Sequence, residues 1–159
     1  MTPTPATAAV RVRRAELSDL DDLVALEDAT FDSDRLSRAQ YRRHLDSDSA
    51  LVLVASANHR RFLGTAVVFF RKGTQVARLY SIASKPEARG KGVGSALIEA
   101  AEDAARARHC HALRLEVRTD NDNAIRLYQR LGYREIGRYE RYYQDGMAAL
   151  RFERMLVGT

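Results

Sequence analysis

A glycine-rich loop directly before an alanine-rich helical segment constrains this chain more than any other feature. Arg89-Gly90-Lys91-Gly92-Val93-Gly94 alternates glycines with two cations. Glycine permits tight turns that aim successive N–H groups at one point, and a helix starting there adds unpaired amides and the positive end of its dipole. Loops of this kind bind phosphate groups. We therefore expect a fold in which this loop and the following helix face a phosphate-bearing ligand.

Two common phosphate-binding motifs do not fit the loop. A dinucleotide fingerprint requires Gly-x-Gly-x-x-Gly directly after a strand. Counting from Gly90 the third glycine would be Ser95, and counting from Gly92 it would be Leu97. A Walker loop requires Gly-Lys-Ser or Gly-Lys-Thr, and neither follows these glycines.

Hydrophobic periodicity predicts a single mixed α/β (α+β) domain with the element order β-α-α-β-β-β-α-β-α-β-β. The expected strands cover residues 10–13, 51–57, 62–71, 76–84, 113–117, 133–139 and 148–156, with a turn at 58–60. The strands from 51 to 84 form an expected antiparallel meander. Residues 1–9 are small and polar with two prolines, so we expect a flexible tail before a domain at 10–157.

Capping residues predict where the helices begin. Ser18 with Asp21, and Ser37 with Gln40, have the spacing of a capping box and open the first two expected helices. The third helix is expected from the glycine loop to about residue 109, and Asn121 or the aspartate after it caps the fourth.

Charge is distributed unevenly and leaves the class of ligand open. The net charge is +5, yet residues 15–34 carry eight acids and no Lys or Arg, so the remainder holds 26 bases against 13 acids (21 − 8). That surplus would suit a nucleic-acid binder, or an enzyme with a polyphosphate ligand and a cationic substrate. The acidic stretch itself would attract a cationic amine or basic peptide, or would complement helix dipoles on a solvated face.

The cysteine content and the hydropathy of the chain limit the cellular compartments in which we expect the protein. A single cysteine, Cys110, excludes an internal disulfide and suits a reducing cytoplasm. No apolar run has the length of a membrane span or a secretory signal. We therefore expect a cytoplasmic protein, a monomer or weak dimer, with no membrane partner.

The residues around the loop resemble the GNAT superfamily of acetyl-coenzyme A-dependent N-acetyltransferases. The family signature (Arg or Gln, two residues, Gly, one residue, Gly or Ala) is met by Arg89, Gly92 and Gly94. Residues 82–87 are similar to the family's Ile-Ala-Val-x-Pro-Glu lead-in, with Ser84 replacing an apolar residue. Similarity to the ribosomal-protein-alanine N-acetyltransferase branch is carried by Leu115-Glu116-Val117-Arg118, Asn121, Ala124-Ile125-x-Leu127-Tyr128 and Leu131-Gly132-Tyr133.

The resemblance implies a fold and a cofactor site. The GNAT fold is a single, mostly antiparallel sheet of about seven strands flanked by about four helices, split between the strands on either side of the cofactor arm. Acetyl-CoA is the implied cosubstrate, with its pyrophosphate at the loop, its pantetheine arm along the strand before it, and no metal. The implied contacts are Ile82, Ala83, Ser84, Arg89, Gly90, Lys91, Gly92, Val93, Gly94, Ser95 and Asn121.

The resemblance also implies catalytic and substrate residues. Glu116 is the implied base that deprotonates the amine, and Tyr128 the acid that protonates the departing thiolate. From the residues alone, a surface ion pair with Arg114 or Arg118 is the favoured explanation of Glu116, and core packing is the alternative explanation of Tyr128. Tentative acceptor residues are Phe31, Asp34, Tyr80, Tyr142 and Tyr143.

These observations predict an N-acetyltransferase that works by direct attack in a ternary complex. The leading acceptor is the N-terminal α-amine of a protein or peptide. Small-molecule amines (a polyamine, amino acid or aminoglycoside) and a non-catalytic acetyl-CoA-binding module remain alternatives. The surplus of bases is not accompanied by the glycine-aromatic signatures of RNA-binding domains, so no direct nucleic-acid binding is expected. His109-Cys110-His111 cannot place three adjacent ligands on one metal, and we expect Cys110 to be a buried, non-catalytic residue.

Overall fold

The structure is a computed structural model that describes residues 10–57 and 61–156. The predicted tail at 1–9, the predicted turn at 58–60 and residue 157 of the expected domain lie outside the described residues. The elements are β1 (Arg11–Arg14), α1 (Leu20–Thr30), α2 (Arg38–Leu45), β2 (Ala50–Ala57), β3 (Arg61–Phe70), β4 (Val76–Ser84), α3 (Val93–Ala107), β5 (Ala112–Arg118), α4 (Asp122–Arg130), β6 (Arg134–Tyr139) and β7 (Ala149–Met155). Their order confirms the prediction.

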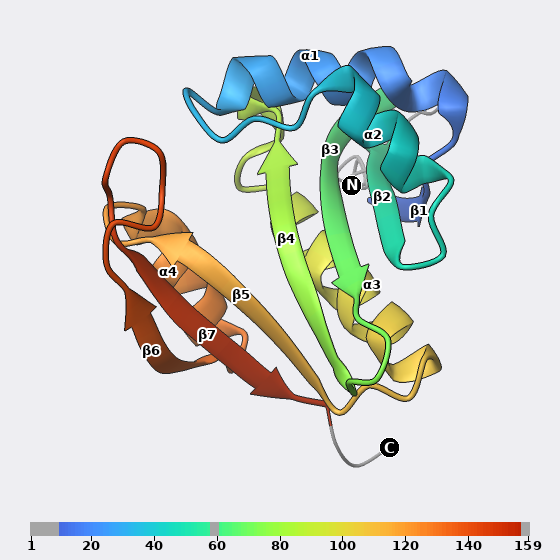
Figure 1. Cartoon of the computed structure of the whole chain (residues 1–159). Coiled ribbons are helices and arrows are strands. Elements are labelled where there is room, and N and C mark those ends of the chain that lie inside the picture. Colours follow the sequence, from blue (N-terminus) through green and yellow to red (C-terminus); the bar gives the residue numbers. More distant parts are fainter. Residues whose placement is uncertain (1–9, 58–60, 157–159) are drawn as a thin grey trace, which may run out of the picture.

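The strands form one seven-stranded sheet in the order β1-β2-β3-β4-β5-β7-β6 (Figure 1). Neighbouring strands are antiparallel except for β4 and β5, which run parallel. The predicted meander is therefore confirmed as β2, β3 and β4. The parallel step arises because α3 crosses over between β4 and β5.

The sheet splits between β4 and β5. The two strands pair only from Val76 to Leu79 and from Ala112 to Leu115. Beyond that point each strand runs on without the other as a partner, and Figure 1 shows the two ends diverging like the arms of a V. The predicted split in the sheet is thus confirmed.

Helices cover the two faces of the sheet unequally. Residues that alternate along β2 enter different clusters: Leu53 and Ala55 pack with α3, whereas Val52 and Val54 pack with α1 and α2. The predicted inner positions of α3, from Val93 to Ala105, are buried. In Figure 1, α3 and α4 lie behind the sheet, while α1 and α2 cover only the half formed by β2 to β4. No helix of the described ranges is long and apolar enough to span a membrane.

Of the two predicted capping boxes, one is confirmed and one is wrong. The Ser37 hydroxyl accepts from the Gln40 amide at 3.1 Å, and the Gln40 side chain accepts from the Ser37 amide at 2.8 Å. The predicted Ser18 box does not form, because Asp19 turns back to accept from the Glu16 amide at 2.7 Å. A short 3₁₀ turn (Leu17–Asp19) therefore precedes α1.

One glycine that the sequence did not single out is required by a close strand approach. A Cβ built on Gly64 of β3 would lie 2.7 Å from the Ala83 carbonyl oxygen on β4. Gly64 therefore lets β3 approach the segment predicted to hold the pantetheine arm.

Candidate active site

The split in the sheet opens into a cleft of about 550 Å³. Its walls are β4 and β5, the loop between α1 and α2, the loop between β6 and β7, and the start of α4. We call this the central cleft. It brings together nine of the residues predicted for the site: Phe31, Asp34, Tyr80, Ile82, Glu116, Asn121, Tyr128, Tyr142 and Tyr143.

The predicted phosphate loop lies outside the lining of the central cleft, as do Ala83 and Ser84. Gly90 and Gly92 have φ values of 78° and 80°, the left-handed region that glycine favours. Gly92 is the N-cap of α3, so the amides of the first helical turn lack intrahelical partners. The Val93 side chain is buried, which leaves only its backbone to face a ligand, whereas Arg89 and Lys91 are exposed. This combination fits a pyrophosphate group.

Glu116 lies at the point where β4 and β5 separate. Its side chain is 14% exposed, and its Oε2 accepts from Arg78 Nε at 3.1 Å. The same guanidinium donates from Nη2 to the Tyr142 hydroxyl at 2.6 Å. The carboxylate therefore faces the cleft in a fixed position, held from β4 and, through Arg78, from the β6–β7 loop.

Arg78 is a site residue that the sequence analysis missed. Its position carries a signal, since Arg78 and Tyr80 alternate with buried Ala77 and Leu79 on β4 and so share one face. The residues near Arg78 in the sequence do not indicate that this face borders Glu116, because the contact joins residues 38 positions apart.

Tyr128 is on α4 and reaches the cleft from the opposite side of the sheet. Only 4% of the residue is exposed, and its ring lies 5.7 Å from that of Tyr133 and 6.3 Å from that of Phe152. Burial raises the pKa of the phenol above its ordinary value of about 10, with a smaller contribution from Tyr143. The hydroxyl therefore stays protonated at neutral pH. Among the described residues it has no hydrogen-bond partner, so its proton is available to a ligand in the cleft.

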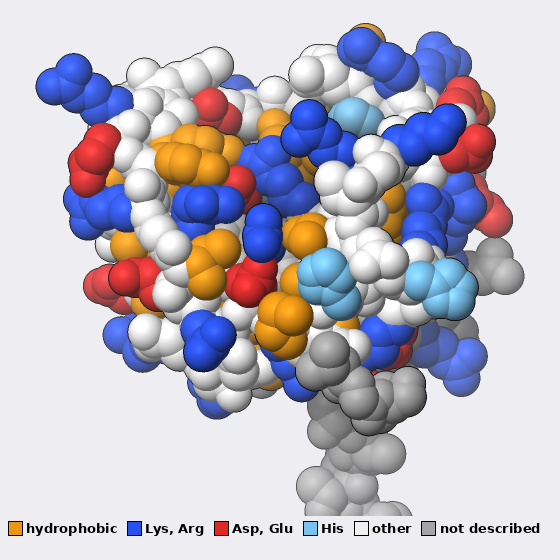
Figure 2. All heavy atoms as spheres, turned by 60° about the horizontal axis from the view of Figure 1, so that its bottom comes forward, with side chains coloured by type: hydrophobic (Ala, Val, Ile, Leu, Met, Phe, Trp, Pro, Cys, Tyr) orange, Lys and Arg blue, Asp and Glu red, His pale blue; other side chains and the backbone are white. Residues whose placement is uncertain are grey.

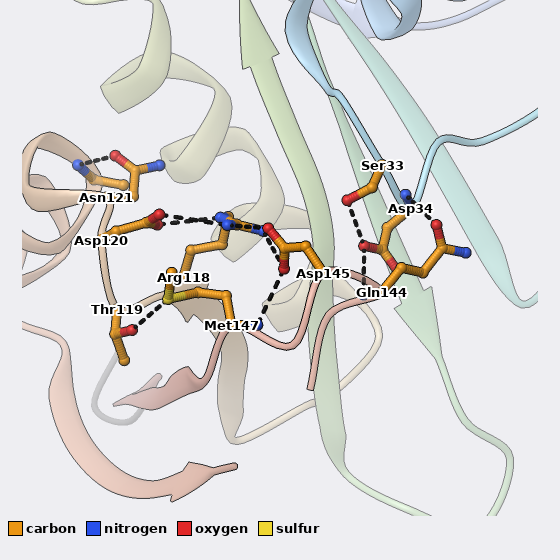
Figure 3. Close-up of polar contacts among 10 residues, drawn as sticks. Ser33, Asp34, Arg118, Thr119, Asp120, Asn121, Gln144, Asp145 and Met147 are labelled. Carbon is orange, nitrogen blue, oxygen red and sulfur yellow. Dashed lines mark hydrogen bonds and ion pairs between the residues drawn. The ribbon is translucent and has the colours of Figure 1, made fainter. Parts of the chain in front are cut away.

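Asn121 and Arg118 organise the end of β5 (Figure 3). Asn121 Oδ1 accepts from the Ala124 amide at 3.2 Å, which confirms the predicted cap of α4. Arg118 donates to Asp120 at 3.1 Å and to Asp145 at 2.6 Å. Because Asp145 belongs to the β6–β7 loop, these ion pairs tie that loop to β5.

The two loops over the cleft are joined to each other. The Asp34 amide donates to Gln144 Oε1 at 3.2 Å, and the Gln144 amide donates to Asp34 Oδ2 at 3.1 Å. Figure 3 shows this reciprocal pair between the α1–α2 and β6–β7 loops. Asp34 adopts a φ of 57°, an uncommon conformation for a residue with a side chain. These two hydrogen bonds therefore join the two loops at the edge of the central cleft.

The acidic stretch at 15–34 divides between structural and cleft positions. Asp19 forms an ion pair with Arg13 at 2.7 Å, and Asp21 forms one with Arg38 at 2.8 Å. Glu27 is 3% exposed and accepts from the Tyr41 hydroxyl at 2.5 Å, although its side chain also borders the cleft. Burial raises the pKa of Glu27. The exposed acids Asp32 and Asp34 remain to give the cleft mouth a negative character.

Cys110 lies at the base of β5, outside the residues that line the cleft. It is 9% exposed, and burial raises the pKa of its thiol. A thiol with a raised pKa is a poor nucleophile at neutral pH. No cluster of three metal-ligating side chains is found among residues 10–57 and 61–156.

Comparison with known proteins identifies the family. Residues 17–133 match the acetyltransferase (GNAT) family model. The chain is 30% identical to N-alpha-acetyltransferase 30 of Schizosaccharomyces pombe, over 76% of this chain and 81% of that protein. Two solved structures cover nearly the whole fold. Ard1 from Thermoplasma volcanium has a TM-score of 0.84 and 26% identity, over 94% of this chain and 99% of that one. The ribosomal-protein-S18-alanine N-acetyltransferase from Escherichia coli has a TM-score of 0.80 and 25% identity, over 95% and 96%.

The chain therefore belongs to the GNAT family of acetyltransferases. It is an acyltransferase of the N-acetyltransferase class, with the GNAT fold that the sequence predicted. GNAT enzymes use acetyl-CoA, which agrees with the phosphate-binding features of the loop before α3.

Proposed function

We propose that this enzyme transfers the acetyl group of acetyl-CoA to the N-terminal α-amine of a protein or peptide, by direct attack in a ternary complex. One observation carries the proposal. A carboxylate fixed on β5 and a protonated phenol on α4 line the same cleft, at the point where the sheet splits. A base for the amine and an acid for the thiolate are the two groups that this reaction requires.

Each side of the cleft has a distinct task in the proposal. The loop from Arg89 to Ser95 holds the pyrophosphate with backbone amides and two cations, and β4 from Ile82 to Ser84 holds the pantetheine arm with backbone groups. Asn121, which lines the cleft, contributes a further contact. Acetyl-CoA supplies the acetyl thioester. Glu116 accepts a proton from the acceptor amine, directly or through a water molecule, and the Tyr128 hydroxyl donates its proton to the thiolate sulfur.

Amine basicity favours an α-amine as the acceptor. A free α-amine has a pKa of about 7.7–8.0 and a lysine side chain one of about 10.4. Deprotonation at pH 7 therefore costs about 1 kcal/mol for the α-amine and about 4.6 kcal/mol for lysine, at 1.36 kcal/mol per pKa unit. A single carboxylate suffices for the first case.

The substrate names of similar proteins support the same acceptor class. The relatives from Schizosaccharomyces pombe and Escherichia coli are named for N-alpha and ribosomal-protein alanine acetylation. In this chain, Tyr80, Tyr142 and Tyr143 would surround the first acceptor residues, with Phe31 and Asp34 contributed by the bridging loop.

An acceptor panel tests the proposal. Thiol release from acetyl-CoA is measured with N-terminal peptides, peptides blocked at the N-terminus that contain an internal lysine, polyamines and aminoglycosides. Wild type is compared with Glu116→Gln and with Glu135→Gln, a matched change at an exposed glutamate on β6. We expect turnover of free N-terminal peptides, lost at least 100-fold in Glu116→Gln and retained in Glu135→Gln.

The other outcomes separate the alternatives. Faster turnover of polyamines or aminoglycosides than of every peptide would replace the peptide acceptor with a small amine. If acetyl-CoA binds by calorimetry while no acceptor class is turned over and a tryptic digest of whole-cell protein gains no acetyl groups, the proposal fails in favour of a non-catalytic acetyl-CoA-binding module.

A further inference from the structure

Exposed apolar side chains gather on one side of the molecule. Five large hydrophobic residues are 38–44% exposed and belong to β4, β6, β7 or the β6–β7 loop: Tyr80, Ile136, Tyr139, Tyr142 and Met155. The rings of Tyr139 and Tyr142 stack at 5.4 Å with an interplanar angle of 14°. Stacked aromatic rings that remain in solvent indicate a contact surface.

Strand register places Tyr139 and several charged residues on the open face of the sheet. On β5, Leu113, Leu115 and Val117 are buried, so Arg114 and Glu116 project from the other face. Residues directly opposite share a face, which adds Glu153 and Arg151 of β7. The same rule adds Arg134 and Tyr139 of β6, because Arg134 opposes Glu153 and Tyr139 opposes Ala149, two residues before Arg151. Figure 1 shows no helix of the described chain in front of β5, β7 and β6.

Arginines cross this face in a row. Arg78 is in register with Arg114, Arg114 opposes Glu153, and Glu153 opposes Arg134, so the row extends over four strands. Arg78 forms an ion pair with Glu116 and Arg114 forms one with Glu153, which offsets the repulsion between these two neighbouring arginines. We call this surface the arginine–tyrosine face, defined by Arg78, Arg114, Arg134, Arg151, Tyr139 and Tyr142. Figure 2 shows blue side chains interleaved with orange ones on the surface where the lower ends of the strands come forward.

We propose that the arginine–tyrosine face binds the segment of the acceptor polypeptide that follows its acetylated N-terminus, and that this segment contains acidic and apolar residues. The inference rests on the proposed function. Continuity supports it, because Arg78 and Tyr142 belong both to the face and to the lining of the central cleft. Charge supports it as well, because the four arginines that define the face outnumber the two carboxylates that share it in register, Glu116 and Glu153.

Geometry sets the length of the segment. The row from β4 to β6 crosses three strand spacings of about 4.8 Å, or about 14 Å in all. An extended polypeptide covers about 3.4 Å per residue, so about four residues beyond the cleft reach across the face. A peptide of about nine residues would therefore contact it, whereas a peptide of four would end within the cleft.

Extended peptides test the inference. All share one N-terminal tetrapeptide taken from the best acceptor of the panel. It is used alone or followed by five residues of Asp, Glu and Phe, of Gly and Ser, or of Lys and Arg. We expect the KM of the acidic nonapeptide to be at least fivefold below that of the Gly/Ser nonapeptide, and the basic one to have the highest KM. The acidic advantage should shrink in 0.5 M salt.

Surface variants locate the effect. Arg134→Ser and Arg151→Ser should each raise the acidic-to-neutral KM ratio from its low wild-type value toward one. The matched control is Arg138→Ser on β6, an exposed arginine that opposes Leu150 and so projects from the other face. This control should keep the full advantage. Because the ratio compares two peptides on one enzyme, a general loss of activity cancels.

The results that would overturn this inference differ from those that would overturn the proposed function. Equal KM values for the three extensions, or an advantage unchanged in both face variants, would overturn the inference while turnover of the tetrapeptide upholds the proposed function. A dimer in sedimentation that Arg134→Ser dissociates, without a change in the KM ratio, would assign the face to a second copy of the chain. Absence of α-acetylation on every peptide would overturn both proposals.

Discussion

Replacing Tyr128 with phenylalanine separates catalysis from packing. The substitution removes one hydroxyl from a residue that is 4% exposed, and that hydroxyl has no partner among the described residues. Loss of a hydroxyl that forms no hydrogen bond with a described residue costs little stability, so we expect Tm to change by less than about 2 °C. Loss of a general acid costs about 10²–10⁴ in rate, so we expect kcat to fall at least 100-fold, equivalent to about 2.7 kcal/mol.

Tyr133→Phe is the matched control, because its ring lies against that of Tyr128. The Tyr133 hydroxyl donates to Glu102 Oε2 at 2.8 Å, and Glu102 is 4% exposed. Removing this donor leaves a buried carboxylate with one partner fewer, which costs about 1–3 kcal/mol and lowers Tm by about 2–10 °C. Turnover at a temperature where the variant is folded should remain near wild type.

The assay follows thiol release at saturating acetyl-CoA and acceptor, with calorimetric Tm measured on the same preparations. Because burial raises the pKa of Tyr128, its ionisation should not contribute a basic limb to the wild-type rate profile below about pH 10. Full turnover by Tyr128→Phe, or equal losses in the two tyrosine variants, would refute the assignment of Tyr128 as the acid.

Three further predictions concern other parts of the molecule. Arg78→Gln removes the guanidinium that donates to the Glu116 carboxylate and to the Tyr142 hydroxyl, and kcat/KM should fall about tenfold with Tm nearly unchanged; equal kinetics would show that the carboxylate needs no such support. Gly92→Ala should strain the N-cap at φ 80° and raise the Kd of acetyl-CoA in calorimetry, whereas Gly73→Ala, at φ 84°, carries the same strain without affecting binding. The Arg13 hydrogen bond, opposed by burial, lowers the pKa of Asp19, so its stabilisation is present at neutral pH and lost as pH falls below about 3.9. Asp19→Asn should therefore cost about 1 kcal/mol in urea unfolding at pH 7, discounted for the half-exposed Arg13, and the difference should vanish near pH 2.

Local patterns determined most of the elements. Alternation predicted the seven strands to within a few residues, and α3 begins at Val93, as the glycine loop indicated. The Ser37 cap was predictable because its partner is three residues away. The Ser18 box does not form, because the Asp19 carboxylate accepts hydrogen bonds from the Glu16 amide and from Arg13. Arg13 lies on β1, so no helix pattern includes it.

The site itself was predicted only in part. The sequence motifs pointed to Glu116 and Tyr128, and the structure brings them to one cleft. Arg78 was missed, as was the bridge between Asp34 and Gln144, which joins residues 110 positions apart. Neither loop's own sequence predicts the contact between Asp34 and Gln144.

The division has a physical reason. Helix starts, glycine turns and strand faces depend on interactions within a few residues, which the order of side chains specifies directly. The split between β4 and β5, the loop bridge and the row of arginines depend on strand order and register. Those are set when the whole sheet packs against its helices, so only the tertiary structure decides which charges and rings meet.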